Sequence, residues 1–83
     1  LCNRVVPADK LLEDTLAWAQ EIAGKAPLSL RYAKQALNAA IEESVSDTIS
    51  GEAKLQHICM GSEDAKEGVA AFLQKRKPEW QGR

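Results

Sequence analysis

The sequence predicts an all-α fold, a small bundle of about four helices preceded by a short strand. Apolar residues recur at helical spacing in four separate segments, and Gly, Pro or Ser residues stand where these segments meet. The connections between the segments are only a few residues long, as packed helices require. With 83 residues, 45% of them apolar, the chain can form one small domain with a thin core.

The short strand is expected over residues 1–6, which read LCNRVV. Val5 and Val6 favour extended structure, and Pro7 disfavours the helical conformation for the residue before it. A lone strand leaves its backbone groups unpaired, so we expect its partner strand outside this sequence. Because the sequence also opens on this segment without Met, we expect it to be a piece of a longer protein.

Two helices are expected between residues 9 and 43. The first runs from about Asp9, a suitable N-cap, to Ala23, and Gly24 suits the left-handed position that ends many helices. The second begins near Pro27, whose fixed φ suits a first turn, and extends to about Glu43. The two apolar stripes comprise Leu11, Leu12, Leu16, Ala19, Ile22 and Ala23, and Leu30, Ala33, Leu37, Ala40 and Ile41.

Two further helices are expected after residue 45. The third begins near Ser46 as N-cap and carries a weaker apolar stripe. The fourth begins after Gly61, with Ser62 as N-cap and two acidic residues in its first turn, and ends before Pro78. The apolar positions are Ile49, Ala53, Leu55, Ile58 and Met60 in the third, and Ala65, Val69, Phe72 and Leu73 in the fourth.

Composition excludes several classes of protein. Eleven basic residues nearly balance twelve acidic ones, so we expect no nucleic-acid partner. No apolar run approaches the roughly 20 residues of a membrane span, and no signal peptide is visible, so the cytoplasm is the expected location. Cys2 and Cys59 lie far apart and His57 is the single histidine, so we expect no metal site.

Three segments, NRVVPADKL, APLSLRYAKQALN and SEDAKEGVAAFLQKRKPEW, occur in this order. Together they resemble the C-terminal region of the enoyl-CoA hydratase/isomerase (crotonase) superfamily, over Asn3 to Arg83. The resemblance implies that residues 1–83 are the helical, trimer-forming C-terminal domain of a crotonase-like α/β enzyme. The catalytic spiral would precede Leu1, and the parent would assemble as a trimer or hexamer.

The resemblance also implies an activity. The substrate would be an acyl thioester of coenzyme A, and the first-choice reaction is reversible hydration of a trans-2-enoyl-CoA in fatty-acid β-oxidation. No prosthetic group is implied. The oxyanion hole and the catalytic glutamates of this family would lie upstream, so we expect no catalytic residue here and an inactive isolated chain.

One ligand contact is implied within the sequence. Family members often use the last helix to contact coenzyme A held by a neighbouring subunit, through an aromatic residue and a lysine. The matching residues are Phe72 and Lys75, three apart and therefore expected on one helix face. If these residues contact no ligand, the alternative for Phe72 is packing in a core or an interface. The alternative for residues 75–77 is a solvated helix end. We expect solvated side chains at Arg76 and Lys77, and Trp80 is a candidate for packing on a neighbouring chain.

Three alternatives remain open on the sequence. The parent could catalyse another reaction of the superfamily, such as double-bond isomerisation. The chain could instead be a free-standing helical acyl-CoA-binding protein, since four-helix carriers have about this length. It could also be an oligomerisation module that touches no ligand. We expect the isolated chain to self-associate through its apolar helix faces.

Overall fold

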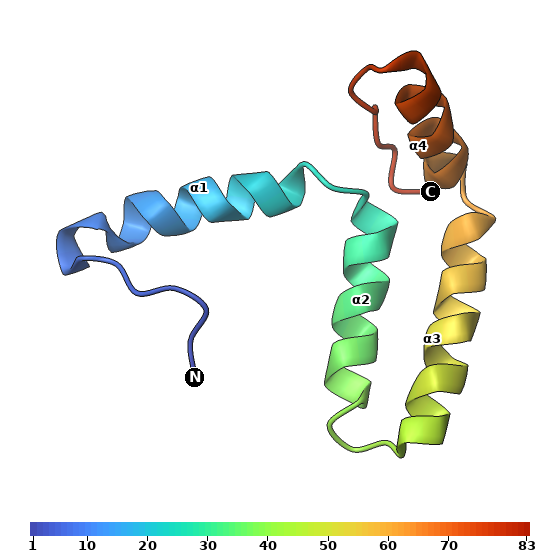
Figure 1. Ribbon diagram of the computed structural model, residues 1–83, viewed down its shortest axis with the longest axis horizontal. Coiled ribbons are helices and arrows are strands. Elements are labelled where there is room, and N and C mark those ends of the chain that lie inside the picture. Colours follow the sequence, from blue (N-terminus) through green and yellow to red (C-terminus); the bar gives the residue numbers. More distant parts are fainter.

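The computed structural model describes all residues 1–83 and confirms an all-helical chain with four α-helices (Figure 1). A short 3₁₀ turn, η1 (Ala8–Lys10), leads into α1 (Leu11–Ala23), which is followed by α2 (Pro27–Ala39), α3 (Val45–Met60) and α4 (Glu63–Gln74). The predicted strand over residues 1–6 is wrong, because these residues form no regular structure. Extended propensity produces a strand only where a second strand accepts its backbone hydrogen bonds, and these 83 residues supply none.

The starts of α2 and α4 agree with the sequence, whereas the start of α3 does not. Pro27 occupies the first turn of α2, and Ser62 Oγ accepts the Ala65 N–H at 3.0 Å as the N-cap of α4. The cap of α3 is Ser44 rather than Ser46. Ser44 Oγ accepts the Asp47 N–H at 3.1 Å and donates to the Asp47 carboxylate at 2.6 Å. This reciprocal pairing across three residues decides between the two serines.

α1 ends at Ala23 as expected, but its start, the conformation of Gly24 and the end of α2 differ from the expectation. Asp9 lies inside η1 and caps nothing, so α1 begins later than predicted. Gly24 has a φ of −75°, which is not left-handed. The chain passes from α1 directly into α2 through a tight turn, in which the Lys25 N–H reaches the Ile22 carbonyl, and this turn needs no positive φ. α2 ends at Ala39, and residues 40–43 form turns.

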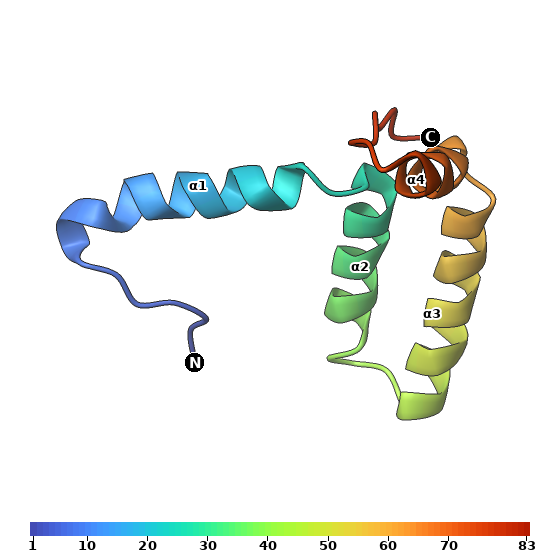
Figure 2. The ribbon, with the colours of Figure 1, turned by 45° about the horizontal axis from the view of Figure 1, so that its top comes forward.

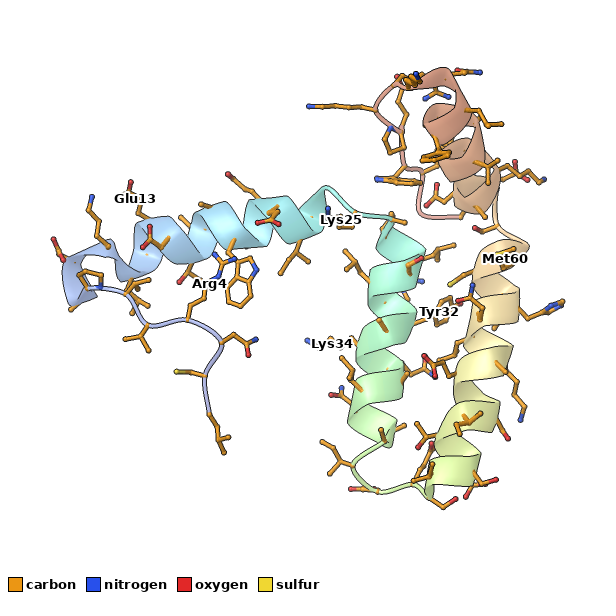
Figure 3. All side chains as sticks on the ribbon, viewed as in Figure 1. Arg4, Glu13, Lys25, Tyr32, Lys34 and Met60 are labelled. Carbon is orange, nitrogen blue, oxygen red and sulfur yellow. The ribbon has the colours of Figure 1, made fainter.

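The helices are arranged around no common core. α2 and α3 run side by side in opposite directions, and α4 lies across the end of this pair at which α2 begins and α3 ends. α1 projects away from the pair (Figures 1 and 2). Tyr32 points from α2 toward α3, whereas Arg4 lies beside α1 with its guanidinium 4.2 Å from the Trp18 ring centroid (Figure 3). The molecule measures 43 × 40 × 17 Å, and only Asp64 and Ala71 are buried.

Most apolar side chains of the helices are consequently exposed. They include Leu11, Leu12, Leu16 and Ile22 on α1, Leu37 on α2, Ile49, Ile58 and Met60 on α3, and Val69, Phe72 and Leu73 on α4. Exposed apolar patches are typical of surfaces that bind another protein segment, a membrane or a ligand. None of the helices combines the length and apolar character that crossing a membrane would require.

Candidate functional site

The two predicted ligand residues lie at the C-terminal end of α4. Phe72 is in the last turn of the helix, and the residue is 82% exposed. Lys75 is also exposed, but it stands just beyond the helix with φ 55° and ψ 38°. The two residues are neighbours, yet the prediction that they share a helix face is wrong. Helical spacing directs side chains only while the backbone is helical, and α4 ends at Gln74.

The backbone at Lys75 forms a left-handed helix stop. The Arg76 N–H donates to the Ala71 carbonyl at 3.0 Å and the Lys75 N–H donates to the Phe72 carbonyl at 3.2 Å, which is the hydrogen-bond pattern of a Schellman motif. Glycine usually occupies the left-handed position, because a side chain there costs about 1 kcal/mol or more. Lys75 is the single non-glycine residue of the chain with a positive φ. The sequence gives no sign of this turn.

After the turn, residues 76–83 return along α4, and we call them the C-terminal strap (Figures 1 and 2). Its first anchor is Glu67. Both terminal guanidinium nitrogens of Arg76 donate to the Glu67 carboxylate, with Nη2–Oε2 at 2.8 Å, and the Glu79 N–H donates to it at 2.8 Å. The hydrogen bond from Arg76, followed by that from the Glu79 backbone, lowers the pKa of Glu67 to about 2. The expectation that Arg76 is merely solvated is therefore wrong.

The second anchor is Asp64, a residue that is only 3% exposed. Its carboxylate accepts the Gln81 N–H at 2.7 Å and the Gly82 N–H at 2.9 Å, while its own N–H donates to the Arg83 carbonyl at 2.9 Å. Asp64 and Glu67 are three residues apart on α4, so the two carboxylates face the strap from adjacent turns. Asp64 is one of the two acidic residues expected in the first turn of this helix, but their interaction with the helix dipole explains none of these long-range contacts.

Trp80 links the strap to a third part of the chain. Its Nε1–H donates to the Gly24 carbonyl at 3.0 Å, at the junction of α1 and α2. Its ring lies against Gly68 of α4 so closely that a Cβ atom there would stand 3.3 Å from Trp80 Cη2. Trp80 thus packs within its own chain. The contact with a neighbouring chain that the sequence suggested stays a prediction.

A groove of about 720 Å³ lies where α4 meets α3 and the start of α2. Leu28, Met60, Val69, Leu73 and Trp80 supply much of its apolar lining. Phe72 and Lys75 do not line this groove. His57 is exposed on α3, and Cys59 is a half-buried free thiol.

The comparison with known families identifies this assembly of helices. The family model described as Enoyl-CoA hydratase/isomerase matches residues 1–83. The chain belongs to this family. The sequence resemblance is thereby confirmed over its full extent.

Individual relatives agree with this assignment. The chain is 42% identical over 80 residues to a protein of Mycobacterium tuberculosis named probable enoyl-CoA hydratase, covering 96% of this chain and 31% of that protein. It is 40% identical over 83 residues to the 2,3-dehydroadipyl-CoA hydratase of Escherichia coli, covering 100% of this chain and 32% of the relative. It therefore spans about a third of the length of the curated relatives that it matches.

Solved structures show the same helical arrangement. An enoyl-CoA hydratase structure from Geobacillus kaustophilus superimposes with a TM-score of 0.89 at 38% identity, covering 98% of this chain and 31% of that chain. The structure of an enoyl-CoA hydratase from Mycobacterium tuberculosis gives a TM-score of 0.90 at 27% identity, covering 98% and 32%. The open layout of the four helices is thus that of the corresponding third of larger enzymes of this family.

Proposed function

We propose that this chain is the C-terminal helical domain of an enzyme that reversibly adds water to a trans-2-enoyl-CoA. The domain would serve subunit assembly and contact the nucleotide end of coenzyme A, and the catalytic spiral would precede it. Membership of the family, and relatives named as hydratases of CoA thioesters, support the proposal. The alternative within the family is an enoyl-CoA isomerase. The cytoplasm is the proposed location.

The left-handed backbone of Lys75 carries the proposed ligand contact. A position that glycine would occupy at lower cost instead holds a long cationic side chain, which makes no ion pair or hydrogen bond within the chain. Strained backbone at a non-glycine residue is a recurrent mark of functional positions. An ammonium group held there suits a phosphate of coenzyme A. The exposed ring of Phe72 beside it offers an apolar surface on which adenine can stack.

The contact is tested by replacing Lys75 with Ala in the full-length protein and measuring coenzyme A affinity by calorimetry. We expect a loss of order 1–2 kcal/mol, which corresponds to about a 5- to 30-fold higher Kd. Lys77→Ala is the matched control, because it removes the same charge two residues away. Equal affinities of the Lys75→Ala variant and the wild type would refute the contact and favour a domain that only assembles subunits.

The reaction is tested on the full-length protein with crotonyl-CoA, following the loss of the enoyl absorbance. Hydration is expected, and residues 1–83 alone should be inactive. Conversion of a 3-enoyl-CoA to the 2-enoyl isomer without hydration would instead establish the isomerase. Tight binding of an acyl-CoA by a monomer of residues 1–83 would support the free-standing carrier and contradict the proposal.

The assembly role rests on the exposed apolar face of α1, which includes Leu12 and Leu16. Burying a leucine side chain at a subunit contact contributes about 1.5–3 kcal/mol. We expect light scattering to find a trimer or hexamer for the full-length protein and smaller species for Leu16→Asp. The matched control is Thr15→Asp, which adds the same charge at the adjacent position on α1. A wild-type monomer at high concentration would contradict the assembly role.

A further inference from the structure

We propose that Glu67 is a positioning residue for Lys75. Its carboxylate binds the guanidinium of Arg76, the residue directly after Lys75. This ion pair stabilises the left-handed turn from which the Lys75 ammonium projects. This inference rests on the coenzyme A contact proposed above and names the side chain that supports it. Glu67 itself touches no ligand in this account, because its carboxylate is fully engaged by the strap.

Arg76 is fixed at both its backbone and its side chain. Its N–H donates to the Ala71 carbonyl at 3.0 Å, and its guanidinium forms a two-pronged pair with Glu67, nine residues earlier. Two parallel N–H···O bonds set orientation as well as distance. With Arg76 held in this way, the chain between Gln74 and Arg76 has little freedom, and Lys75 stays in a conformation that it would otherwise avoid.

The ion pair between Glu67 and Arg76 is partly shielded from water, which favours a fixed geometry. The Glu67 side chain is 23% exposed and that of Arg76 is 39% exposed, whereas the Glu63–Lys66 pair one turn away is exposed at 60% and 69%. Surface pairs of the latter kind contribute little. Glu67 also accepts the Glu79 N–H, so it fixes the strap at two points and not at the arginine alone.

The far end of the strap is tied independently. Asp64 holds the Gln81 and Gly82 N–H groups, and Trp80 donates to the Gly24 carbonyl. The strap is therefore held against α4 near both of its ends. Among these anchors, Glu67 is the one that acts on the residue next to Lys75, and this makes it specific for the position of the ammonium.

The test uses the full-length protein, with coenzyme A as the probe for affinity and crotonyl-CoA for turnover. Glu67→Gln should raise the Kd for coenzyme A about three- to tenfold and leave kcat at saturating substrate unchanged. Glu63→Gln is the matched control, since it removes the same charge from the same helix. Its Kd should equal that of the wild type. An unchanged Kd in Glu67→Gln would refute the positioning role.

A merely structural effect is separated by repeating the substitution in the Lys75→Ala background. If Glu67 acts through Lys75, Glu67→Gln should change the Kd there by less than about twofold. A full additional loss would refute the inference. If Lys75→Ala alone has no effect, the coenzyme A contact falls and this inference falls with it. If Lys75→Ala raises the Kd for coenzyme A but Glu67→Gln does not, the coenzyme A contact is supported and only the positioning role of Glu67 is refuted. Should Glu67→Gln fail to fold by circular dichroism, Arg76→Gln tests the same grip with the same expected outcomes.

Discussion

Removing the Asp64 carboxylate should release the last residues of the C-terminal strap, from Gln81 onward, from α4. In Asp64→Ala, the N–H groups of Gln81 and Gly82 lose a charged acceptor that lies 2.7 and 2.9 Å away. Hydrogen bonds to a charged group contribute about 1.5–3 kcal/mol each. In the variant, the released residues become exposed to water, which accepts hydrogen bonds from both N–H groups. We therefore add no penalty for buried donors without an acceptor. Because both bonds are only part-buried, we take the lower end of this range for each, so the free energy of opening this end of the strap should fall by roughly 3 kcal/mol.

Amide hydrogen exchange measures this opening residue by residue. A loss of about 3 kcal/mol raises the open population roughly a hundredfold, so the Gln81 and Gly82 amides should exchange about a hundred times faster. Asp64→Asn should show a smaller increase, because one amide oxygen can still accept one of the two bonds. Amides in the middle of α3 should not change.

The control for this experiment is Asp14→Ala. Asp14 also lies in the first turn of a helix, α1, but it is exposed and receives no returning chain. The variant loses the same interaction with the helix dipole without touching the strap. If Asp64→Ala accelerated exchange at Gln81 and Gly82 by less than about threefold, or no more than Asp14→Ala does, the role of Asp64 as an anchor of the strap would be refuted.

Three further outcomes follow from the same contacts. Since the folded pKa of Glu67 lies near 2, below the ordinary 4.5, its pairing with Arg76 stabilises the fold at neutral pH. The stabilisation is lost as the pH falls from 4.5 toward 2, and a Glu67 carboxyl titration by NMR with a midpoint near 4.5 would contradict this. Lys75→Gly should be about 1 kcal/mol more stable than Lys75→Ala in thermal unfolding, because glycine adopts the left-handed turn without strain; the opposite order would disprove the strain. In a Trp80→Ala background, Gly68→Ala should stabilise the protein by about 1 kcal/mol through helix propensity. Beside the intact indole the gain should be clearly smaller, and the thermal midpoints of the wild type and the three variants measure both gains; equal gains would contradict the close packing of Trp80 on Gly68.

Local signals were sufficient for the features that are decided locally. Pro27 and Ser62 mark the starts of α2 and α4, because a fixed φ and a side-chain cap act within three or four residues. The N-cap of α3 shows the limit of such signals, since Ser44 and Ser46 both suit the role. The reciprocal bond between Ser44 and Asp47 selects one of them. The predicted strand failed because strand formation depends on a partner that a local pattern does not contain.

The candidate site was predicted only in part. Family resemblance and spacing point to Phe72 and Lys75, but the turn that orients Lys75 carries none of the usual glycine signal. Asp64 and Glu67 were visible only as acidic residues near a helix start. The one available hint was an arginine beyond the helix end, nine residues after Glu67, and this hint has meaning only if the chain reverses direction between them.

The sequence by itself determined the helical class, the approximate positions of four helices and the family to which the chain belongs, because periodicity, caps and motif order are written in neighbouring residues. Only the tertiary structure decided that the chain reverses at Lys75, that Glu67 and Asp64 grip the returning strap, and that Trp80 reaches Gly24 across 56 residues. These contacts join residues that are distant in the chain, and their geometry depends on a backbone reversal that no local preference of the residues involved favours.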